Sequence, residues 1–169
     1  MAHWQQYNIE ERLQLLDIAS AEKNLPKPAI EKDWWVTMVL KALSQTQYSN
    51  LFSFKGGTSL SKGWSLIERF SEDVDIAIKR DGRFAITGTS NTQLAKARRT
   101  VRHYVVREFP TELEDILRSF GVSDFNIEPE ISKHYGDEEY ELRADTHPSV
   151  IYVNYKSILP EMSEYLLPR

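Results

Sequence analysis

The order of hydrophobic and polar positions divides the chain into an all-helical beginning and a later part in which strands alternate with helices. Apolar residues recur at helical spacing from Ile9 to Leu16 and predict an amphipathic helix over residues 9–23. A second helix is expected to begin near Pro28, because proline suits the first turn of a helix. We expect its charged run at 31–33 to be solvated, and its core positions to be Ile30, Trp34, Trp35, Met38, Val39 and Ala42.

The later part of the chain carries the strand signals. The elements predicted there are strands at 51–54 and 73–78, a long helix from about 92 to 120, a strand at 125–131, a loop-rich polar stretch at 133–147 and a strand at 150–156. Pro110 can interrupt the long helix, and Pro129 places its strand at an edge or bulge. This order predicts an α/β fold in which helices pack on a mixed sheet, with the strand order left open.

Composition limits the class of protein. A chain of 169 residues suits one domain, and the absence of cysteine excludes disulfides and thiol chemistry. The four histidines are scattered without metal-ligand spacing, which argues against a zinc site. No apolar run approaches the roughly 18–20 residues of a membrane span, and the N-terminus lacks the features of a signal peptide. We therefore expect a cytoplasmic protein with no membrane partner.

A glycine pair at the end of the first predicted strand is one half of a candidate phosphate site. Gly56 and Gly57 allow positive φ angles and a close approach of the backbone to a ligand. Thr58 or Ser59 is expected to cap a helix that opens there, and the free N–H groups of a helix N-terminus attract phosphate. The Walker phosphate loop is excluded, because it needs Gly-Lys followed by Ser or Thr, whereas Lys62 precedes a glycine.

Two aspartates on the next predicted strand, Asp73 and Asp75, are the other half. Side chains alternate between the faces of a strand, so Val74, Ile76 and Ile78 should point into the core and both acids away from it. The acids' Cα atoms are then about 6.5–7 Å apart, which lets both carboxylates reach one cation or a close pair of cations. Mg²⁺ (or Mn²⁺) is the expected metal, because it takes few carboxylates and completes its coordination with substrate phosphates.

Cationic side chains flank the turn and the acids. Lys62, and less strongly Lys55, are candidates for phosphate contact, with ordinary surface lysines as the alternative. Arg69 can contact phosphate or orient a neighbouring acid through a bidentate pair. Glu72 alternates to the face opposite Asp73, which makes it a poorer metal ligand than the two aspartates.

A basic cluster lies within twelve positions of the long predicted helix. It comprises Lys96, Arg98, Arg99, Arg102, His103 and Arg107. The apolar stripe of the same helix, expected to face the core, comprises Leu94, Ala97, Val101 and Val105. The basic face either docks the phosphate backbone of a nucleic-acid acceptor or is an ordinary solvated helix face. The net charge of −4 argues against a protein that coats nucleic acid broadly.

The order of these elements resembles the nucleotidyltransferase superfamily of the DNA polymerase β type. It consists of a strand, a Gly-Gly turn, a helix and a second strand with the Asp-x-Asp motif. Residues 29–36, 54–62 and 69–76 are also similar to the AbiEii/AbiGii family, the toxins of bacterial abortive-infection and toxin–antitoxin loci. The similarity is dense over residues 29–78 and thinner beyond them. It implies a nucleotidyltransferase-fold sheet with the site at one edge.

The resemblance implies a metal-dependent nucleotidyltransferase that acts as a toxin in phage defence, with a cognate antitoxin as partner. Asp73 and Asp75 would be the catalytic metal ligands. An acceptor hydroxyl, on RNA such as a tRNA 3′ end or on a protein, would attack the α-phosphorus of a nucleoside triphosphate and release pyrophosphate. The nucleotide-binding residues would be Gly56, Gly57, Thr58, Ser59, Lys62 and Arg69.

Family members are longer and carry a lysine and another acid downstream that complete the site. We therefore expect residues 1–169 to form a single nucleotidyltransferase core domain, either as the N-terminal portion of a longer protein or as a naturally shortened relative. The alternative function is a non-catalytic module that keeps the nucleotide-binding scaffold and acts by binding a partner. A metal-dependent phosphohydrolase shares paired aspartates but would not need the Gly-Gly turn.

Overall fold

The computed structural model describes residues 4–63, 73–136, 138–143 and 147–159. Helices come first, and strands and helices then alternate, as the sequence predicts. The longer helices are α1 (Ile9–Lys23), α2 (Lys27–Leu43), α4 (Asn91–His103) and α5 (Phe109–Ser119), and the short helical segments are η1 (Trp4–Gln6), η2 (Ser49–Leu51), α3 (Gly56–Thr58), η3 (Ser59–Gly63), η4 (Gly82–Phe84) and η5 (Tyr104–Glu108). The strands are β1 (Phe52–Lys55), β2 (Asp75–Ile78), β3 (Phe125–Pro129), β4 (Ser132–Tyr135), β5 (Glu138–Glu141) and β6 (Ile151–Tyr155).

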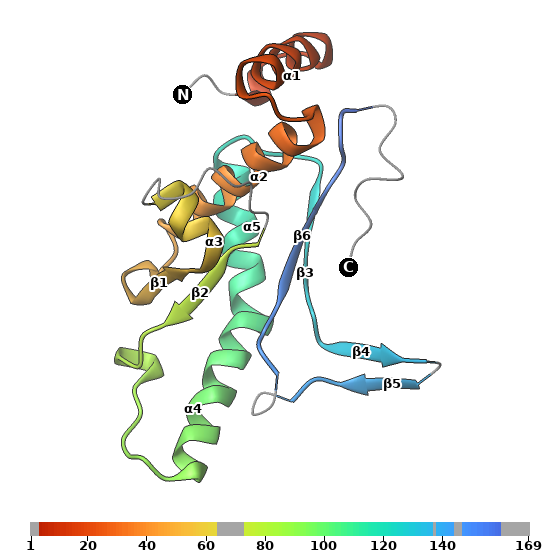
Figure 1. Cartoon of the computed structure of the whole chain (residues 1–169). Helices are drawn as coiled ribbons and strands as arrows, with labels where there is room; N and C mark the ends of the chain where they lie inside the picture. The colour runs from red at the N-terminus through yellow and green to blue at the C-terminus, as the bar shows by residue number, and fades with distance from the viewer. Residues whose placement is uncertain (1–3, 64–72, 137, 144–146, 160–169) are drawn as a thin grey trace.

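The α/β class predicted from the sequence is confirmed. Within the described residues the strands form three two-stranded antiparallel sheets, β1–β2, β3–β6 and β4–β5, where the sequence led us to expect one mixed sheet. Helices α2 and α5 lie between the β1–β2 pair and the β3–β6 pair, which keeps the two pairs apart (Figure 1). None of the helices in the described part of the chain combines the length and apolar character that a membrane crossing needs.

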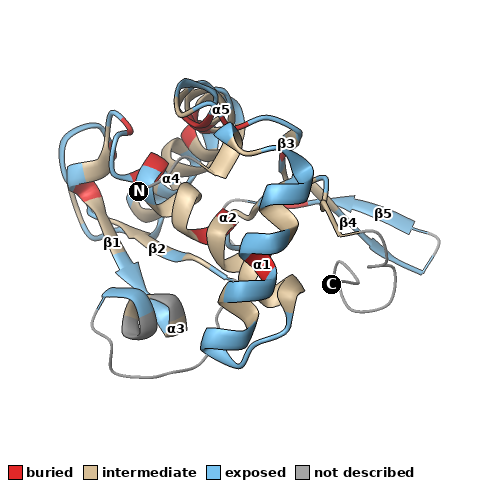
Figure 2. Cartoon of the chain, turned by 90° about the horizontal axis from the view of Figure 1, so that it is seen from above, coloured by how far each residue is buried: buried red, intermediate tan, exposed pale blue. Residues whose placement is uncertain are grey.

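Helix α1 spans the residues predicted for it, and its ends are set by side-chain and backbone caps. The Asn8 side chain accepts a hydrogen bond from the backbone N–H of Glu11, whose carboxylate accepts one from the N–H of Asn8. The helix is nevertheless mostly exposed (Figure 2). Its one buried residue is Leu16, whereas Ile9, which the sequence assigned to the apolar stripe, is 62% exposed.

Helix α2 carries the centre of the core. Trp35 stacks on Tyr155 of β6 with 4.7 Å between ring centroids, and meets Phe125 of β3 edge-on. Trp35 and Ala42 are buried, as predicted, while Trp34 is only half-buried. Burying these rings fixes the β3–β6 pair against one side of α2.

Glu31 of α2 contradicts the prediction that residues 31–33 form a solvated face. Its side chain is 2% exposed, and its carboxylate accepts hydrogen bonds from the Ser157 hydroxyl (2.6 Å) and the Ile158 backbone N–H (2.9 Å). Glu31 precedes Trp35 by four residues, so it lies on the buried face of the helix. A buried carboxylate needs such partners, and here they come from the chain that follows β6.

The long helix predicted from about 92 to 120 is confirmed as α4, η5 and α5 in succession, and Pro110 widens it instead of ending it. Proline lacks an N–H group, and in a regular α-helix its ring would clash with the carbonyl of Val106. The wider π-type turns of η5, immediately before α5, accommodate this position. Tyr104 in η5 and Phe109 at the start of α5 are both buried.

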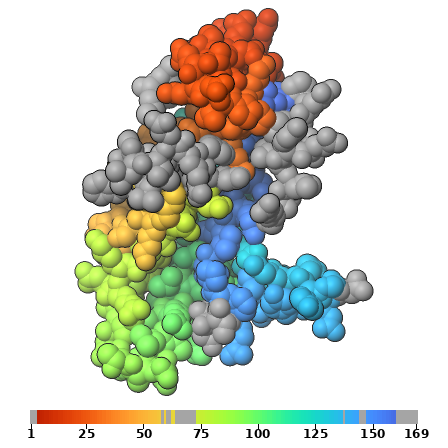
Figure 3. Space-filling view, viewed as in Figure 1, coloured from red at the N-terminus to blue at the C-terminus, as the bar shows by residue number. Residues whose placement is uncertain are grey.

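Strands β3 and β6 confirm the predicted strands at 125–131 and 150–156, with Ile127 opposite Val153. The prediction of a loop-rich stretch at 133–147 is wrong for residues 133–135 and 138–141, which belong to the strands of the β4–β5 hairpin. Gly136, with φ at 62°, supplies the turn. Every residue of β5 is exposed, so the segment lacks the apolar alternation by which a half-buried strand is recognised. The hairpin projects from the body of the molecule (Figures 1 and 3).

We expect Glu31→Ala to lower the free energy of unfolding by about 2–3 kcal/mol, because it removes the acceptor of two buried hydrogen bonds to a charged group. Urea denaturation would measure this, with Glu22→Ala on the exposed side of α1 as the control. Equal denaturation midpoints for the two variants would contradict a fastening role for Glu31.

Candidate functional site

The β1–β2 pair brings the glycine turn and the acid pair together. The two strands are antiparallel, and Lys55, the last residue of β1, lies opposite Asp75, the first residue of β2. Gly56 follows Lys55 directly, so the turn begins where the acid-bearing strand begins. Two motifs separated by sixteen residues in the sequence therefore form one end of a two-stranded sheet.

Gly56 is in contact with the Asp75 carboxylate. Its φ angle is 68°, in the left-handed region, and a Cβ atom placed on it would lie 2.1 Å from Oδ2 of Asp75. Only glycine meets both conditions without strain or displacement of the acid. The positive φ that the sequence associates with the glycine pair is thus found at Gly56.

The helical turn begins earlier than the sequence indicates. Its first residue is Gly56, with Lys55 at the N-cap and no side chain capping it. Thr58 lies inside this turn and Ser59 at its end, so the prediction that one of them caps the helix is wrong. The local reason is that Gly56 turns the backbone through its left-handed φ at once.

The two aspartates are exposed, and the apolar residues that alternate with them pack on the core. Asp73 and Asp75 lie on the solvated side, whereas Val74, Ile76 and Ile78 contact the hydrophobic cluster around Trp35, which confirms the predicted alternation. Among the described residues no group of three or more His, Asp and Glu side chains gathers at a metal-binding distance. The arrangement therefore offers a pair of carboxylates.

Lys62 lies beside helix α2. Its Nζ is 2.8 Å from the Asp33 carboxylate and donates a hydrogen bond to the Thr37 hydroxyl at 2.9 Å. These contacts hold the helical segment after the glycine turn against α2. Of the other residues predicted for the site, Lys55 is exposed at the end of β1, and Arg69 lies outside the described residues.

Lys32 of α2 lies within electrostatic range of the Asp73 carboxylate. Its side chain is half-buried, and burial lowers the pKa of its ammonium group, while the nearby charge of Asp73 acts in the opposite direction. Because residues 31–33 were expected to be solvated, a half-buried Lys32 was not expected. A usable signal was present, since Lys32 precedes the buried Val36 by four residues and so lies toward the core side of α2.

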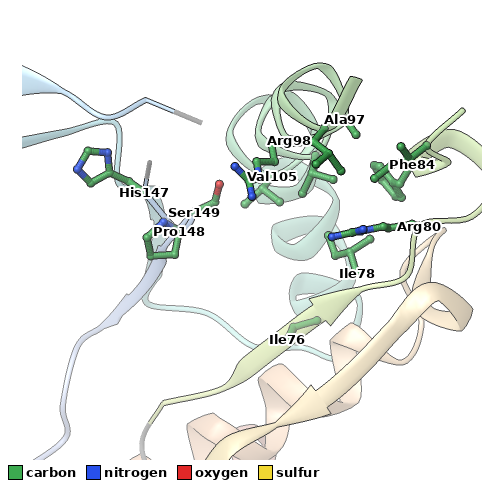
Figure 4. Close-up of a pocket in the computed structure, with 13 residues that line it drawn as sticks. Ile76, Ile78, Arg80, Phe84, Ala97, Arg98, Val105, His147, Pro148 and Ser149 are labelled. Carbon is green, nitrogen blue, oxygen red and sulfur yellow. The ribbon is translucent and has the colours of Figure 1, made fainter. Parts of the chain in front are cut away.

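The opposite face of β2 opens on a hollow of about 480 Å³, which the acids do not line. Ile76 and Ile78 of β2 form one wall, and the predicted apolar stripe of α4 and the segment 147–149 form the others. Arg98 of α4 and Arg80, two residues beyond the end of β2, also line it (Figure 4). On the outside of the helix the basic positions are exposed, namely Lys96, Arg99, His103 and Arg107.

The order of β1, a glycine turn in contact with the Asp75 carboxylate, a helical segment and β2, with Asp73 two residues before it, is the arrangement by which the sequence resembles nucleotidyltransferases. Residues 39–159 match the family described as "Nucleotidyl transferase AbiEii toxin, Type IV TA system". This match covers more than half of the chain, and the chain therefore belongs to the AbiEii nucleotidyltransferase toxin family. Comparison with curated proteins and with solved structures finds no match. Membership of a toxin–antitoxin family implies a cognate antitoxin.

We expect Gly56→Ala to lower nucleotidyl transfer by about 10²-fold, because the new methyl group must push the Asp75 carboxylate aside. Gly82→Ala is the matched control, since Gly82 also has a positive φ (53°) but has nothing within 4 Å of the added atom. Both variants should lose about 1–2 kcal/mol of stability from the left-handed backbone. Parallel loss of activity in both would mean that the Gly56–Asp75 contact is unimportant.

Proposed function

We propose that this protein transfers a nucleotide from a nucleoside triphosphate to an acceptor in a reaction that requires a divalent metal. The observation that carries the proposal is the contact between the glycine turn and Asp75, because it places a turn without a Cβ atom directly beside a carboxylate. Gly56, Gly57, Thr58 and Ser59 would seat the phosphates. The proposed setting is the cytoplasm, as the toxin of a phage-defence locus.

Asp73 and Asp75 fit Mg²⁺ or Mn²⁺. Magnesium sites in nucleotide enzymes commonly use one or two carboxylates and take further oxygens from the substrate's phosphates and from water. Two exposed acids, Asp75 at the start of β2 and Asp73 two residues before it, meet that requirement without a third protein ligand. A bound metal would neutralise charge on the triphosphate.

The protein's own contribution to this reaction is positioning and electrostatics. The acceptor oxygen forms a bond to the α-phosphorus, the bond to the bridging oxygen breaks, and pyrophosphate leaves with the electron pair. The β1–β2 pairing holds Asp75 against the turn, and the bonds from Lys62 to α2 hold the segment that follows the turn. Fixed groups of this kind lower the barrier because they need not reorganise during the reaction.

RNA is the proposed acceptor. Helix α4 and η5 present exposed cationic side chains from Lys96 to Arg107, and such a strip can follow a phosphate backbone. Leu94, Val101 and Val105 line the hollow beside β2, and so does Arg98 of the basic cluster, whereas Lys96, Arg99, His103 and Arg107 do not line it. The rival function is a non-catalytic module that binds nucleotide or a partner on the same scaffold.

One experiment separates the transferase from the module. The protein is incubated with Mg²⁺, total RNA and each of the four nucleoside triphosphates in turn, labelled on either the α- or the γ-phosphate. Transfer of the α-label but not the γ-label to RNA supports nucleotidyl transfer to RNA. If the α-label is found on protein instead, the acceptor is a protein and not RNA. Nucleotide binding without transfer of either label would favour the non-catalytic module.

We expect Asp73→Asn with Asp75→Asn to abolish Mg²⁺-dependent nucleotide binding while leaving the unfolding curve little changed, because both side chains are exposed. Isothermal titration with each triphosphate, with and without Mg²⁺, would measure it. The control is Asp17→Asn with Asp115→Asn, which makes the same chemical change at exposed positions on α1 and α5. If the Asp73/Asp75 variant keeps its Mg²⁺-dependent affinity for nucleotide, the proposed metal site is wrong.

We expect Arg99→Glu with Arg107→Glu to weaken RNA binding, most strongly at low salt, because fewer counterions are released from the phosphate backbone. The affinity of this variant for nucleoside triphosphates should stay unchanged. Lys23→Glu with Lys41→Glu changes the net charge equally on α1 and α2 and should cost much less affinity. Filter binding at several salt concentrations would check this, and equal losses for the two pairs would leave α4 an ordinary solvated helix.

A further inference from the structure

The β4–β5 hairpin is a two-stranded ribbon that stands out from the body of the molecule (Figure 3). Within the described residues its strands pair with each other and with no third strand, and β5 is exposed along its whole length. A ribbon of two strands is only marginally stable in water, and it gains stability when one face packs against a helix or further strands. The hairpin therefore has a face that a partner could cover.

One face of the hairpin carries two exposed tyrosines. Tyr135 pairs with Glu138, and Lys133, two residues earlier on β4, pairs with Tyr140, so these four side chains share one face of the ribbon. Tyr135 is 85% exposed and Tyr140 is 41% exposed. Tyrosine is enriched at protein interfaces, where it combines a large apolar ring with a polar hydroxyl. This face thus has the composition of a protein-binding surface.

The hairpin is acidic, whereas α4 and η5 are basic. Residues 132–141 contain four acids and one lysine, and residues 96–107 contain five lysines and arginines and no acid. We call the exposed basic residues that do not line the hollow the basic strip, namely Lys96, Arg99, His103 and Arg107. Carboxylates attract these cations, and tyrosine rings bind guanidinium groups through cation–π contacts. The two surfaces of this chain are therefore complementary to each other.

The two surfaces also agree in length, and they lie apart within one molecule. The seven residues from Lys96 to His103 advance the helix by about 10 Å, and the four residues of β5 span about 10 Å. The hairpin projects from the body on the side away from α4 (Figures 1 and 2). The hairpin of a second copy is thus the complementary partner that the chain itself supplies.

We propose that the β4–β5 hairpin of one copy docks on the basic strip of a second copy, with its tyrosine face toward the helix. The hairpin gains the packing against a helix that it lacks in the single chain, and the strip gains an anionic partner. Each copy has both surfaces, so each can donate a hairpin and receive one. RNA is anionic too and would compete with the hairpin for the strip, but the docking itself does not depend on the proposed function.

The test measures self-association of the protein by sedimentation equilibrium, without RNA or nucleotide, at low and at high salt. Glu138→Lys with Glu141→Lys reverses the charge of the hairpin, and both side chains are exposed. Arg99→Glu with Arg107→Glu reverses the charge of the strip. Glu10→Lys with Glu22→Lys is the matched control, which makes the hairpin's change at exposed positions of α1.

The wild type and the α1 control should associate alike, and more weakly at high salt because ions screen the charges. Each reversed variant alone should associate at least about tenfold more weakly than the wild type, since like charges then face each other. An equimolar mixture of the two reversed variants should recover the wild-type affinity, because every hairpin then finds a strip of opposite charge. Tyr135→Ala should weaken association by about two- to fivefold through loss of the ring.

The inference is overturned if the wild type remains monomeric at low salt up to its solubility. It is also overturned if the wild type associates and neither reversal weakens the association, since another surface would then be responsible. If both reversals weaken association but their mixture does not recover it, the hairpin and the strip do not meet. None of these results bears on nucleotidyl transfer, because the measurements contain neither nucleotide nor RNA.

Discussion

The close approach of the Gly56 backbone to the Asp75 carboxylate is the constraint on which the site depends. It requires the left-handed φ at Gly56, a residue without a Cβ atom, and an antiparallel register that places Asp75 opposite Lys55. A shift of the register by one residue would turn Asp75 to the core and Ile76 to solvent. The hydrophobic packing of Val74, Ile76 and Ile78 therefore holds the chemistry in place from the other face of the same strand.

Helix α2 links this strand pair to the rest of the molecule. Trp35 packs on β3 and β6, while Glu31 fastens the chain beyond β6 and Asp33 fastens the segment beyond the glycine turn. Polar residues at the start of the helix and aromatic ones along it thus join two sheets that share no hydrogen-bonded edge among the described residues.

Strand β2 separates two environments. One side bears exposed carboxylates, which suit a metal and a triphosphate, and the other faces the hollow shared with α4. The basic positions Lys96, Arg99, His103 and Arg107 of α4 and η5 are exposed, whereas the net charge of the whole chain is negative. A local cationic strip on an acidic protein favours contact at one place over general coating of RNA.

Local sequence determined the elements whose signals are local. The helix at 9–23, the alternation from Asp73 to Ile78, the strands predicted at 125–131 and 150–156, and the family resemblance could all be recognised in the residues themselves. Tertiary structure alone decided which long-range partners each polar group finds. Glu31 is buried because chain 126 residues away supplies its hydrogen bonds, and Lys62 pairs with Asp33 and Thr37 because folding brings its segment against α2. The exposed β4–β5 hairpin was not predicted for a related reason. Cross-strand pairing stabilises it, and its sequence lacks the apolar pattern by which a strand is recognised.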